Sequence, residues 1–118
     1  MRLLPPPDAD LPPPIREPER IAAEIGDASG HRGQAQALYR PCSEAELSAV
    51  LVEATRCRVP VTVVAARTST TGGSVPEGGW IVSTLRLRRI LAIDARGRTA
   101  RAEAGVTLGD LQRAVAAE

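Results

Sequence analysis

The feature that most constrains the fold is a capped helix that runs directly into a β-branched strand. Ser43 and Glu46 have the spacing of a capping box, in which side chains satisfy free backbone amides at a helix N-terminus. The apolar residues that follow share one helical face: Leu47, Val50, Leu51 and Ala54. We expect this helix to end near Cys57, before Pro60, and residues 61–64 to form a short buried strand. A helix, a buried strand and a loop of small residues predict an α+β or mixed α/β domain.

Shorter patterns predict the remaining elements. A short helix is expected at 18–25, and a polar loop at 26–37. Three further strands are expected at 80–83, 89–95 and 99–104, the last two joined by a turn. Thr107 and Asp110 have the spacing of a cap for a final helix. The sum is a small β-sheet flanked by helices.

The chain divides into three parts. Residues 1–17 hold six of the ten prolines and predict an extended leader that adds little to a core. Residues 18–38 hold the first helix and the polar loop, and residues 39–118 form a partial domain. The chain stops at Glu118, within what reads as a running helix without a Gly, Asn or Pro to end it. We therefore expect truncation at the C-terminus.

Composition narrows the possible functions. With 118 residues, no Phe and single Trp and Tyr residues, the chain has room for one small aliphatic core, marginally stable or completed by another segment. A formal net charge of +1 differs from the basic footprint of a nucleic-acid binder, and no aromatic platform for bases is present. We expect no nucleic-acid partner.

The cysteines and the N-terminus bear on location. Cys42 and Cys57 bracket the predicted helix and should lie about 20 Å apart, well beyond the roughly 7 Å that a disulfide allows between Cα atoms. Two unbridged thiols fit a reducing compartment. No signal-peptide pattern opens the sequence, and no apolar run approaches the roughly 20 residues of a transmembrane helix. The expected location is cytoplasmic, with no transmembrane segment.

The segment that could carry chemistry is the loop after the strand at 61–64. Four consecutive hydroxyl residues, 68–71, precede Gly72 and Gly73. Backbone amides in such a loop can converge on an anion, and small side chains let a pyrophosphate approach the backbone. A solvated hydroxyl-rich turn is the alternative, which the residue types alone slightly favour. The loop is not a P-loop, because it lacks a Gly-Lys-Ser/Thr ending.

Four motifs in register resemble one flavoprotein family. The start at 40–43 resembles its proline, serine and acidic opening, and the loop at 68–76 resembles its Thr-Ser-Leu-Thr-Gly-Gly-Ala-Val-Pro run. Two further signatures follow at 90–94 and 104–111. Residues 39–118 therefore resemble the start of the FAD-binding domain of the vanillyl-alcohol oxidase and p-cresol methylhydroxylase (PCMH) superfamily. Within it, the glycolate oxidase and D-lactate dehydrogenase branch is most similar.

The resemblance implies a PCMH-type fold and a cofactor, FAD, whose pyrophosphate is held mainly by backbone amides of this loop. The matching positions are Ala65, Ala66, Arg67, Thr68, Ser69, Thr71, Gly72 and Gly73. Relatives that attach FAD covalently use a His where this chain has Thr68, so FAD is expected to bind non-covalently. The only histidine, His31, is interpreted as a surface residue. No metal site is expected.

One departure from the family concerns the start of the loop. Relatives usually carry Arg-Gly-x-Gly where this chain has residues 64–67, Val-Ala-Ala-Arg. Without those glycines, a backbone with positive φ is hindered there. Arg67 could contact phosphate in compensation, or it could be solvent-exposed or paired with an acid.

Two functions remain open. In the first, the chain is the N-terminal fragment of an FAD-linked oxidoreductase that removes hydride from a 2-hydroxy acid such as glycolate or D-lactate. Its partners are then FAD and the rest of the FAD and substrate domains, in cis or in trans, and no catalytic residue lies in this part. In the second, the chain is a non-catalytic module or split subunit that completes an FAD site with a partner.

Overall fold

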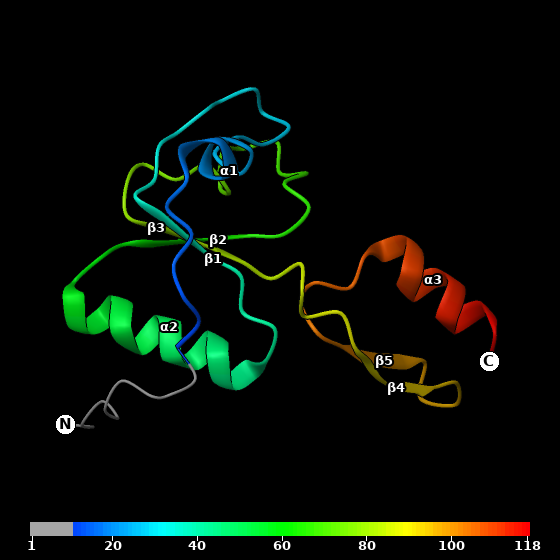
Figure 1. The fold of residues 1–118 in the computed structure, drawn as a ribbon. Helices are drawn as coiled ribbons and strands as arrows, with labels where there is room; N and C mark the ends of the chain where they lie inside the picture. Colours follow the sequence, from blue (N-terminus) through cyan, green and yellow to red (C-terminus); the bar gives the residue numbers. More distant parts are fainter. Residues whose placement is uncertain (1–10) are drawn as a thin grey trace.

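A computed structural model describes residues 11–118, so the first ten residues of the predicted leader lie outside the described part. The elements, in chain order, are α1 (Pro18–Ala22), β1 (Ala37–Tyr39), α2 (Glu44–Cys57), β2 (Val61–Val64), β3 (Trp80–Ser83), β4 (Ile90–Asp94), β5 (Thr99–Ala102) and α3 (Leu108–Ala116). The prediction of small sheets flanked by helices is confirmed (Figure 1).

The first part of the chain forms three layers. β1, β3 and β2 make a parallel sheet in that order, so the strand that comes last in the sequence lies in the centre. α1 and α2 lie on opposite faces of this sheet (Figure 1). Because the strands are parallel, the chain leaves all three at the same edge, and the loops that follow them gather there.

Each face of the sheet has its own aliphatic core. On the face of α2, Val50 and Ala54 pack with Tyr39 and Trp80, whose ring centroids lie 5.0 Å apart. On the face of α1, Ile21 packs with alternate strand residues, which are Leu38, Val64 and Ile81. This split follows from the alternation of side chains along a strand. Burial raises the pKa of the Tyr39 hydroxyl above its ordinary value.

The predicted capping residues begin α2. The Ser43 hydroxyl accepts a hydrogen bond from the backbone amide of Glu46 at 3.1 Å. The Glu46 carboxylate reaches back one residue further than a standard capping box, and it accepts from the backbone amide of Cys42 at 2.7 Å. At the other end, Arg58 adopts a left-handed conformation that closes the helix. Cys42 and Cys57 are both free and exposed.

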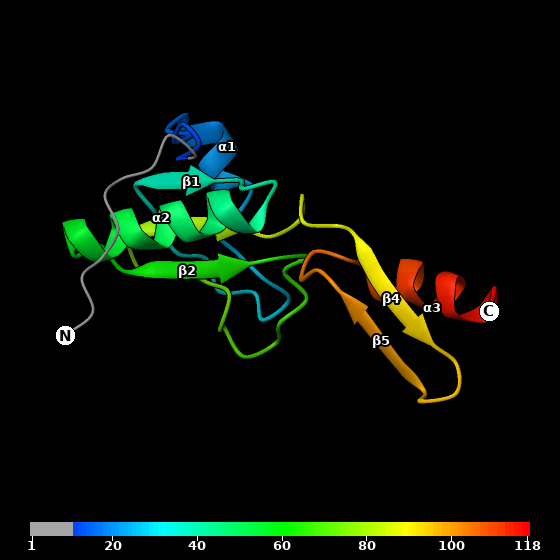
Figure 2. The same cartoon turned by 90° about the horizontal axis from the view of Figure 1, so that it is seen from below.

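The second part of the chain, β4, β5 and α3, lies to one side of the three layers (Figures 1 and 2). β4 and β5 form an antiparallel hairpin with a register shift between Ile90 and Ala92. α3 has no buried residue, and Leu108 is 71% exposed. The hairpin and α3 therefore present apolar surface that nothing in the described part of the chain covers.

Gly105 joins the second part to the end of β3. Its amide donates to the carbonyl of Leu87 at 2.8 Å, and a Cβ at this position would lie 1.9 Å from the carbonyl oxygen of Thr84. Thr84 in turn donates its amide to Val64 at the end of β2. Only glycine permits this approach of two backbones.

Four details differ from expectation. Residues 37–39 form a strand where a loop and a helix approach were predicted, because pairing with β3 fixes a segment too short to show a period. α1 ends at Ala22 rather than residue 25, and α3 ends at Ala116 rather than running through the last residue. The leader does reach the core, since Leu11 and Ile15 pack against it.

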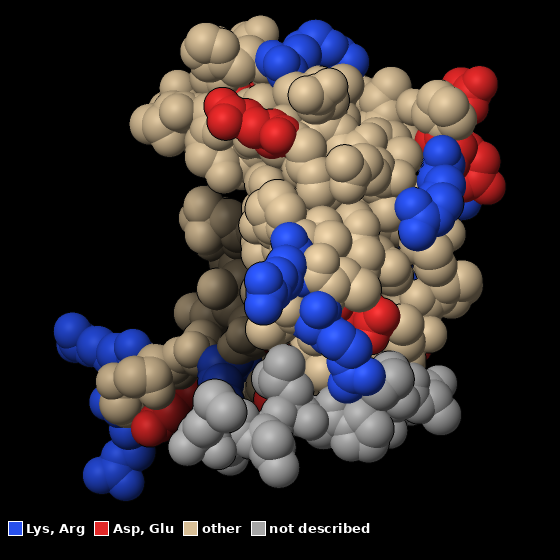
Figure 3. Space-filling model, turned by 90° about the vertical axis from the view of Figure 1, so that its left-hand side faces the viewer, with Lys and Arg blue, Asp and Glu red and all other residues tan. Residues whose placement is uncertain are grey.

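Charges on the described surface are mixed. Figure 3 shows a face on which acidic and basic side chains are scattered over uncharged surface, some of them next to one another. None of the described helices is both long and apolar enough to cross a membrane.

Replacing the N-cap of α2 tests its contribution to stability. We expect Ser43→Ala to lower the free energy of unfolding by about 1 kcal/mol, because the amide of Glu46 loses its acceptor. Urea denaturation followed by circular dichroism measures the change. Ser48→Ala, at an exposed position of the same helix, is the matched control and should alter stability by no more than about 0.5 kcal/mol. Equal effects of the two substitutions contradict the capping role.

The same cap predicts a dependence on pH. The hydrogen bond from the Cys42 amide holds the pKa of the Glu46 carboxyl below its ordinary value of 4.5. A carboxyl with a lower pKa in the folded state stabilises the fold above its ordinary pKa, and this contribution is lost as the pH falls. Denaturation at about pH 6 and about pH 3 should therefore show a smaller loss for Glu46→Gln than for the wild type. An identical loss in both proteins argues against this linkage.

Candidate functional site

The predicted site loop begins where β2 ends and leads back to β3. A second segment, residues 26–36, runs beside it before entering β1. The two are joined by backbone hydrogen bonds, from the Gln34 amide to the Pro76 carbonyl at 2.9 Å and from the Gly78 amide to the Gln34 carbonyl at 2.8 Å. A Cβ on Gly33 would lie 1.8 Å from the carbonyl oxygen of Pro76, so the contact requires glycine.

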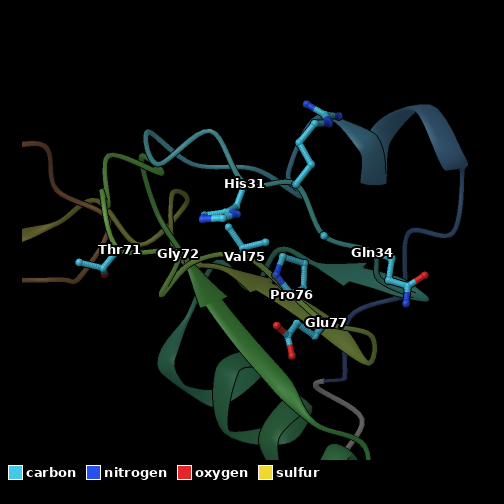
Figure 4. Close-up of a pocket in the computed structure, with 9 residues that line it drawn as sticks. His31, Gln34, Thr71, Gly72, Val75, Pro76 and Glu77 are labelled. Atoms are coloured by element: carbon cyan, nitrogen blue, oxygen red, sulfur yellow. The ribbon is translucent and has the colours of Figure 1, made fainter.

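Two grooves open along these segments. The larger encloses about 710 Å³ and is lined by residues 31–34 on one side and by residues 71, 72 and 75–77 on the other. Figure 4 shows its labelled side chains, with His31 and Gln34 on the first segment and Thr71, Val75, Pro76 and Glu77 on the second. A second groove of about 440 Å³ shares His31 and Arg32 with the first. The loop and the segment at 26–36 therefore form opposite sides of the larger groove.

The structure places the eight predicted positions around these grooves unevenly. Thr71 and Gly72 line the larger groove, and Ala66 and Arg67 line the second. The remaining four belong to the same loop but line neither of these two grooves: Ala65, Thr68, Ser69 and Gly73.

The loop has backbone donors available for an anion. Among the described residues, none accepts a hydrogen bond from the amides of Thr68, Ser69, Gly72 or Gly73. Backbone amides left free in a tight loop form anion-binding concavities. The Ser69 and Thr71 hydroxyls lie 3.3 Å apart in the same loop and add further donors.

The two glycines leave the backbone open. Gly72 has φ of +79°, a conformation that favours glycine, and the nearest atom to a Cβ there is His31 Cδ2 at 3.8 Å. At Gly73 the nearest atoms are hydroxyl oxygens of Thr71 and Ser69, at 3.7 and 3.8 Å. A methyl group at either position would therefore meet no clash within the protein. These residues fit a pyrophosphate group.

Arg67 pairs with an acid instead of pointing into free solvent. Its backbone is left-handed, with φ of +55°, which costs a residue other than glycine about 1–2 kcal/mol. Its guanidinium donates to the carbonyl of Ala23, and its Nε lies 3.3 Å from Oε2 of Glu24. The sequence left open whether Arg67 contacts phosphate, faces solvent or pairs with an acid, and in the structure it pairs with an acid.

Glu24 also pairs with a second arginine. Its Oε1 lies 3.0 Å from Nη2 of Arg40, and the residue is only 5% exposed. Arg40 directly follows β1, while Arg67 follows β2. A buried carboxylate is tolerated when cations pair with it, as two do here. The charge on Arg67 is thus partly neutralised within the protein.

Asp27 lines the second groove from the segment at 26–36. Its Oδ1 accepts hydrogen bonds from the amide of Ser29 at 2.8 Å and from the Ser29 hydroxyl. The Ser29 hydroxyl holds the pKa of Asp27 below its ordinary value, with smaller contributions from the Ser29 amide, the Ser69 hydroxyl and the Ser74 backbone. Asp27 therefore stabilises the turn at residues 27–29.

Several residues at the site were not predicted. His31 is exposed, in agreement with its interpretation as a surface residue, but it lines both grooves. Glu24 and Gly33 had no signal in the sequence, because their roles depend on segments that meet only in the folded sheet. The described residues contain no group of three or more His, Cys, Asp and Glu side chains that could hold a metal ion.

Comparison with known proteins assigns the family. Residues 35–118 match the family of FAD binding domains. Over 99 residues the chain is 33% identical to the glycolate oxidase subunit GlcD of Escherichia coli, a match that covers 83% of this chain and 20% of GlcD. The chain thus spans about a fifth of the length of the curated relatives that it matches.

Solved structures show the same fold. The 6-hydroxy-D-nicotine oxidase of Arthrobacter nicotinovorans superimposes with a TM-score of 0.74 at 22% identity, over 98% of this chain and 26% of that enzyme. The xylooligosaccharide oxidase of Myceliophthora thermophila gives 0.67 at 18% identity, over 90% of this chain and 23% of the enzyme. The chain belongs to the FAD binding domain family of flavoprotein oxidoreductases, and its fold is that of the PCMH-type domain. FAD is the cofactor of this family.

A methyl group at Gly73 tests the loop. The test uses the full gene product, meaning the whole protein encoded by the reading frame that contains these residues. We expect Gly73→Ala to weaken FAD binding about tenfold or more, because the added methyl group hinders close approach of a phosphate to the backbone of the loop. Thermal stability without FAD should stay unchanged, because the methyl group meets no atom closer than 3.7 Å. Flavin fluorescence titration and a thermal melt measure the two quantities.

Gly109→Ala is the matched control for this experiment. Gly109 lies in α3, and a Cβ there meets only the Arg113 guanidinium at an ordinary 3.6 Å. It should bind FAD as the wild type does. If Gly73→Ala also leaves FAD affinity unchanged, the loop is not the pyrophosphate site.

Proposed function

We propose that the loop at residues 65–73 binds the pyrophosphate of FAD, without a covalent bond, in an oxidoreductase that acts on a 2-hydroxy acid. The observation that carries this proposal is the set of free amides at Thr68, Ser69, Gly72 and Gly73, placed at the carboxyl edge of a parallel sheet. Ligands of parallel α/β sheets bind at this edge. The eight predicted positions, Ala65 to Ser69 together with Thr71 to Gly73, stay the proposed cofactor-binding set.

The chain's own residues would contribute binding and orientation. The free amides would hold the phosphate oxygens, and the pairing of Arg67 with Glu24 would keep the loop in place. When bound, FAD would supply the chemistry by accepting hydride from the α-carbon of the substrate. We place the groups that bind substrate and remove its proton outside residues 1–118. We also propose that the chain consists of a leader (1–17), a helix with a polar loop (18–38) and a partial FAD-binding domain (39–118).

The substrate class is supported by one relative. The curated match is a glycolate oxidase subunit, and glycolate is a 2-hydroxy acid. We also propose a cytoplasmic location, which the two free, exposed thiols support.

A second candidate is a module that completes an FAD site with a separate chain. The observation that favours it is the apolar surface of β4 and α3, where Leu91 is 48% and Val115 is 46% exposed. An exposed apolar patch of this kind marks a surface that packs against another segment. That segment could be part of the same polypeptide or of a partner, and the two candidates share the same cofactor loop.

Flavin reduction tests the proposed substrate class. The full gene product loaded with FAD should lose its visible flavin absorbance when glycolate or D-lactate is added without oxygen, because hydride transfer reduces the flavin. L-lactate and xylobiose serve as comparison substrates. Bleaching by the sugar alone overturns the 2-hydroxy-acid assignment. Bound FAD that no substrate bleaches favours the module, and a protein that retains no FAD overturns both candidates.

A further inference from the structure

We infer that Glu24 is a positioning residue for FAD: its ion pairs with Arg67 and Arg40 hold the cofactor loop in the left-handed turn that a glycine would otherwise provide. The inference rests on the proposed function of the loop and adds a residue that precedes β1. Its basis is one buried carboxylate that contacts the segments following two different strands.

The backbone of Arg67 adopts a left-handed conformation. With φ of +55° it occupies a region that L side chains rarely adopt and that glycine enters freely. The next residue is Thr68, whose amide is among the free donors. The direction of those donors therefore depends on the conformation of Arg67.

The side chain of Arg67 contacts the segment that follows α1. Its guanidinium reaches back to the end of α1, where it meets the Ala23 carbonyl and the Glu24 carboxylate. Both contacts pull the side chain away from the loop amides. Arg67 thus acts as an anchor for the turn, and its charge is directed to Glu24.

Arg40 is the second arginine that pairs with Glu24. It lies directly after β1 and contacts the other carboxylate oxygen of Glu24. The carboxylate is therefore held from two sides in a buried position, and it has little freedom to follow a moving loop. The turn after β2 is in this way tied to the end of β1, across the central strand β3.

A double-mutant experiment on the full gene product tests this inference through FAD affinity measured by flavin fluorescence. Glu24→Gln should weaken FAD binding about tenfold, because the turn loses its anchor. Arg67 belongs to the proposed cofactor-binding set through its backbone alone, and Arg67→Gly keeps that backbone. This variant should therefore bind FAD within about threefold of the wild type, since glycine adopts the turn unaided. In the double variant, Arg67→Gly should restore most of the affinity lost in Glu24→Gln. A purely structural role of Glu24 in the segment after α1 predicts no such rescue.

Hydrogen exchange provides a readout without FAD. Amides of residues 66–73 should exchange faster in Glu24→Gln than in the wild type, and the double variant should return toward wild-type rates. Arg58→Gly is the matched control, because Arg58 has the same φ of +55° at the end of α2, away from the loop. It should change neither the exchange of 66–73 nor FAD affinity.

The outcomes separate this inference from the proposed function. A wild type that binds no FAD overturns both. A wild type that binds FAD while Glu24→Gln binds it equally well overturns only the inference, as does loss of binding in Arg67→Gly, which would assign Arg67 to direct phosphate contact. Should Glu24→Gln fail to fold, Arg67→Ala against Arg67→Gly decides: only alanine is strained in the left-handed turn, so equal affinities overturn the inference.

Discussion

One buried carboxylate connects three segments of the structure. Glu24 closes the segment after α1 and accepts two arginines, one from the end of β1 and one from the start of the loop after β2. The sheet and the core that it shares with α1 bring these three segments together, and the ion pairs of Glu24 then connect their ends directly, although β3 separates the two strands. A carboxylate removed from water needs such partners, so the requirement of Glu24 for positive charge becomes a constraint on the loop geometry.

The parallel sheet determines where chemistry can occur. Its strands all point their carboxyl ends toward the same edge, and the loop with free amides emerges there together with Arg40. The segment at 26–36 is brought alongside by hydrogen bonds to residues 76–79, which extend the pairing of β1 with β3. Groove and loop are thus consequences of sheet registration. The aliphatic cores on both faces keep that registration rigid.

Local signals predicted much of this arrangement. Ser43 and Glu46 mark the start of α2, and the β-branched run marks β2, because both depend on neighbours in sequence. The residue types at 68–73 left two alternatives open, an anion-binding loop and a solvated turn, and the resemblance to a flavoprotein family favoured the first. Features that depend on contacts between residues far apart in the sequence could not be predicted. β1 has three residues and no period, Gly33 owes its role to Pro76, and a charged residue such as Glu24 is ordinarily expected at the surface.

The position of β3 in the centre of the sheet has a consequence for assembly. β1 and β2 do not pair with each other. Each pairs only with β3, which is synthesised after both. No strand of this sheet can pair before β3, Trp80–Ser83, begins to be synthesised, and pairing of β2 with β3 closes the loop between them. Such non-local pairing slows folding. The nascent chain therefore closes this loop in the same step in which β2 joins the sheet.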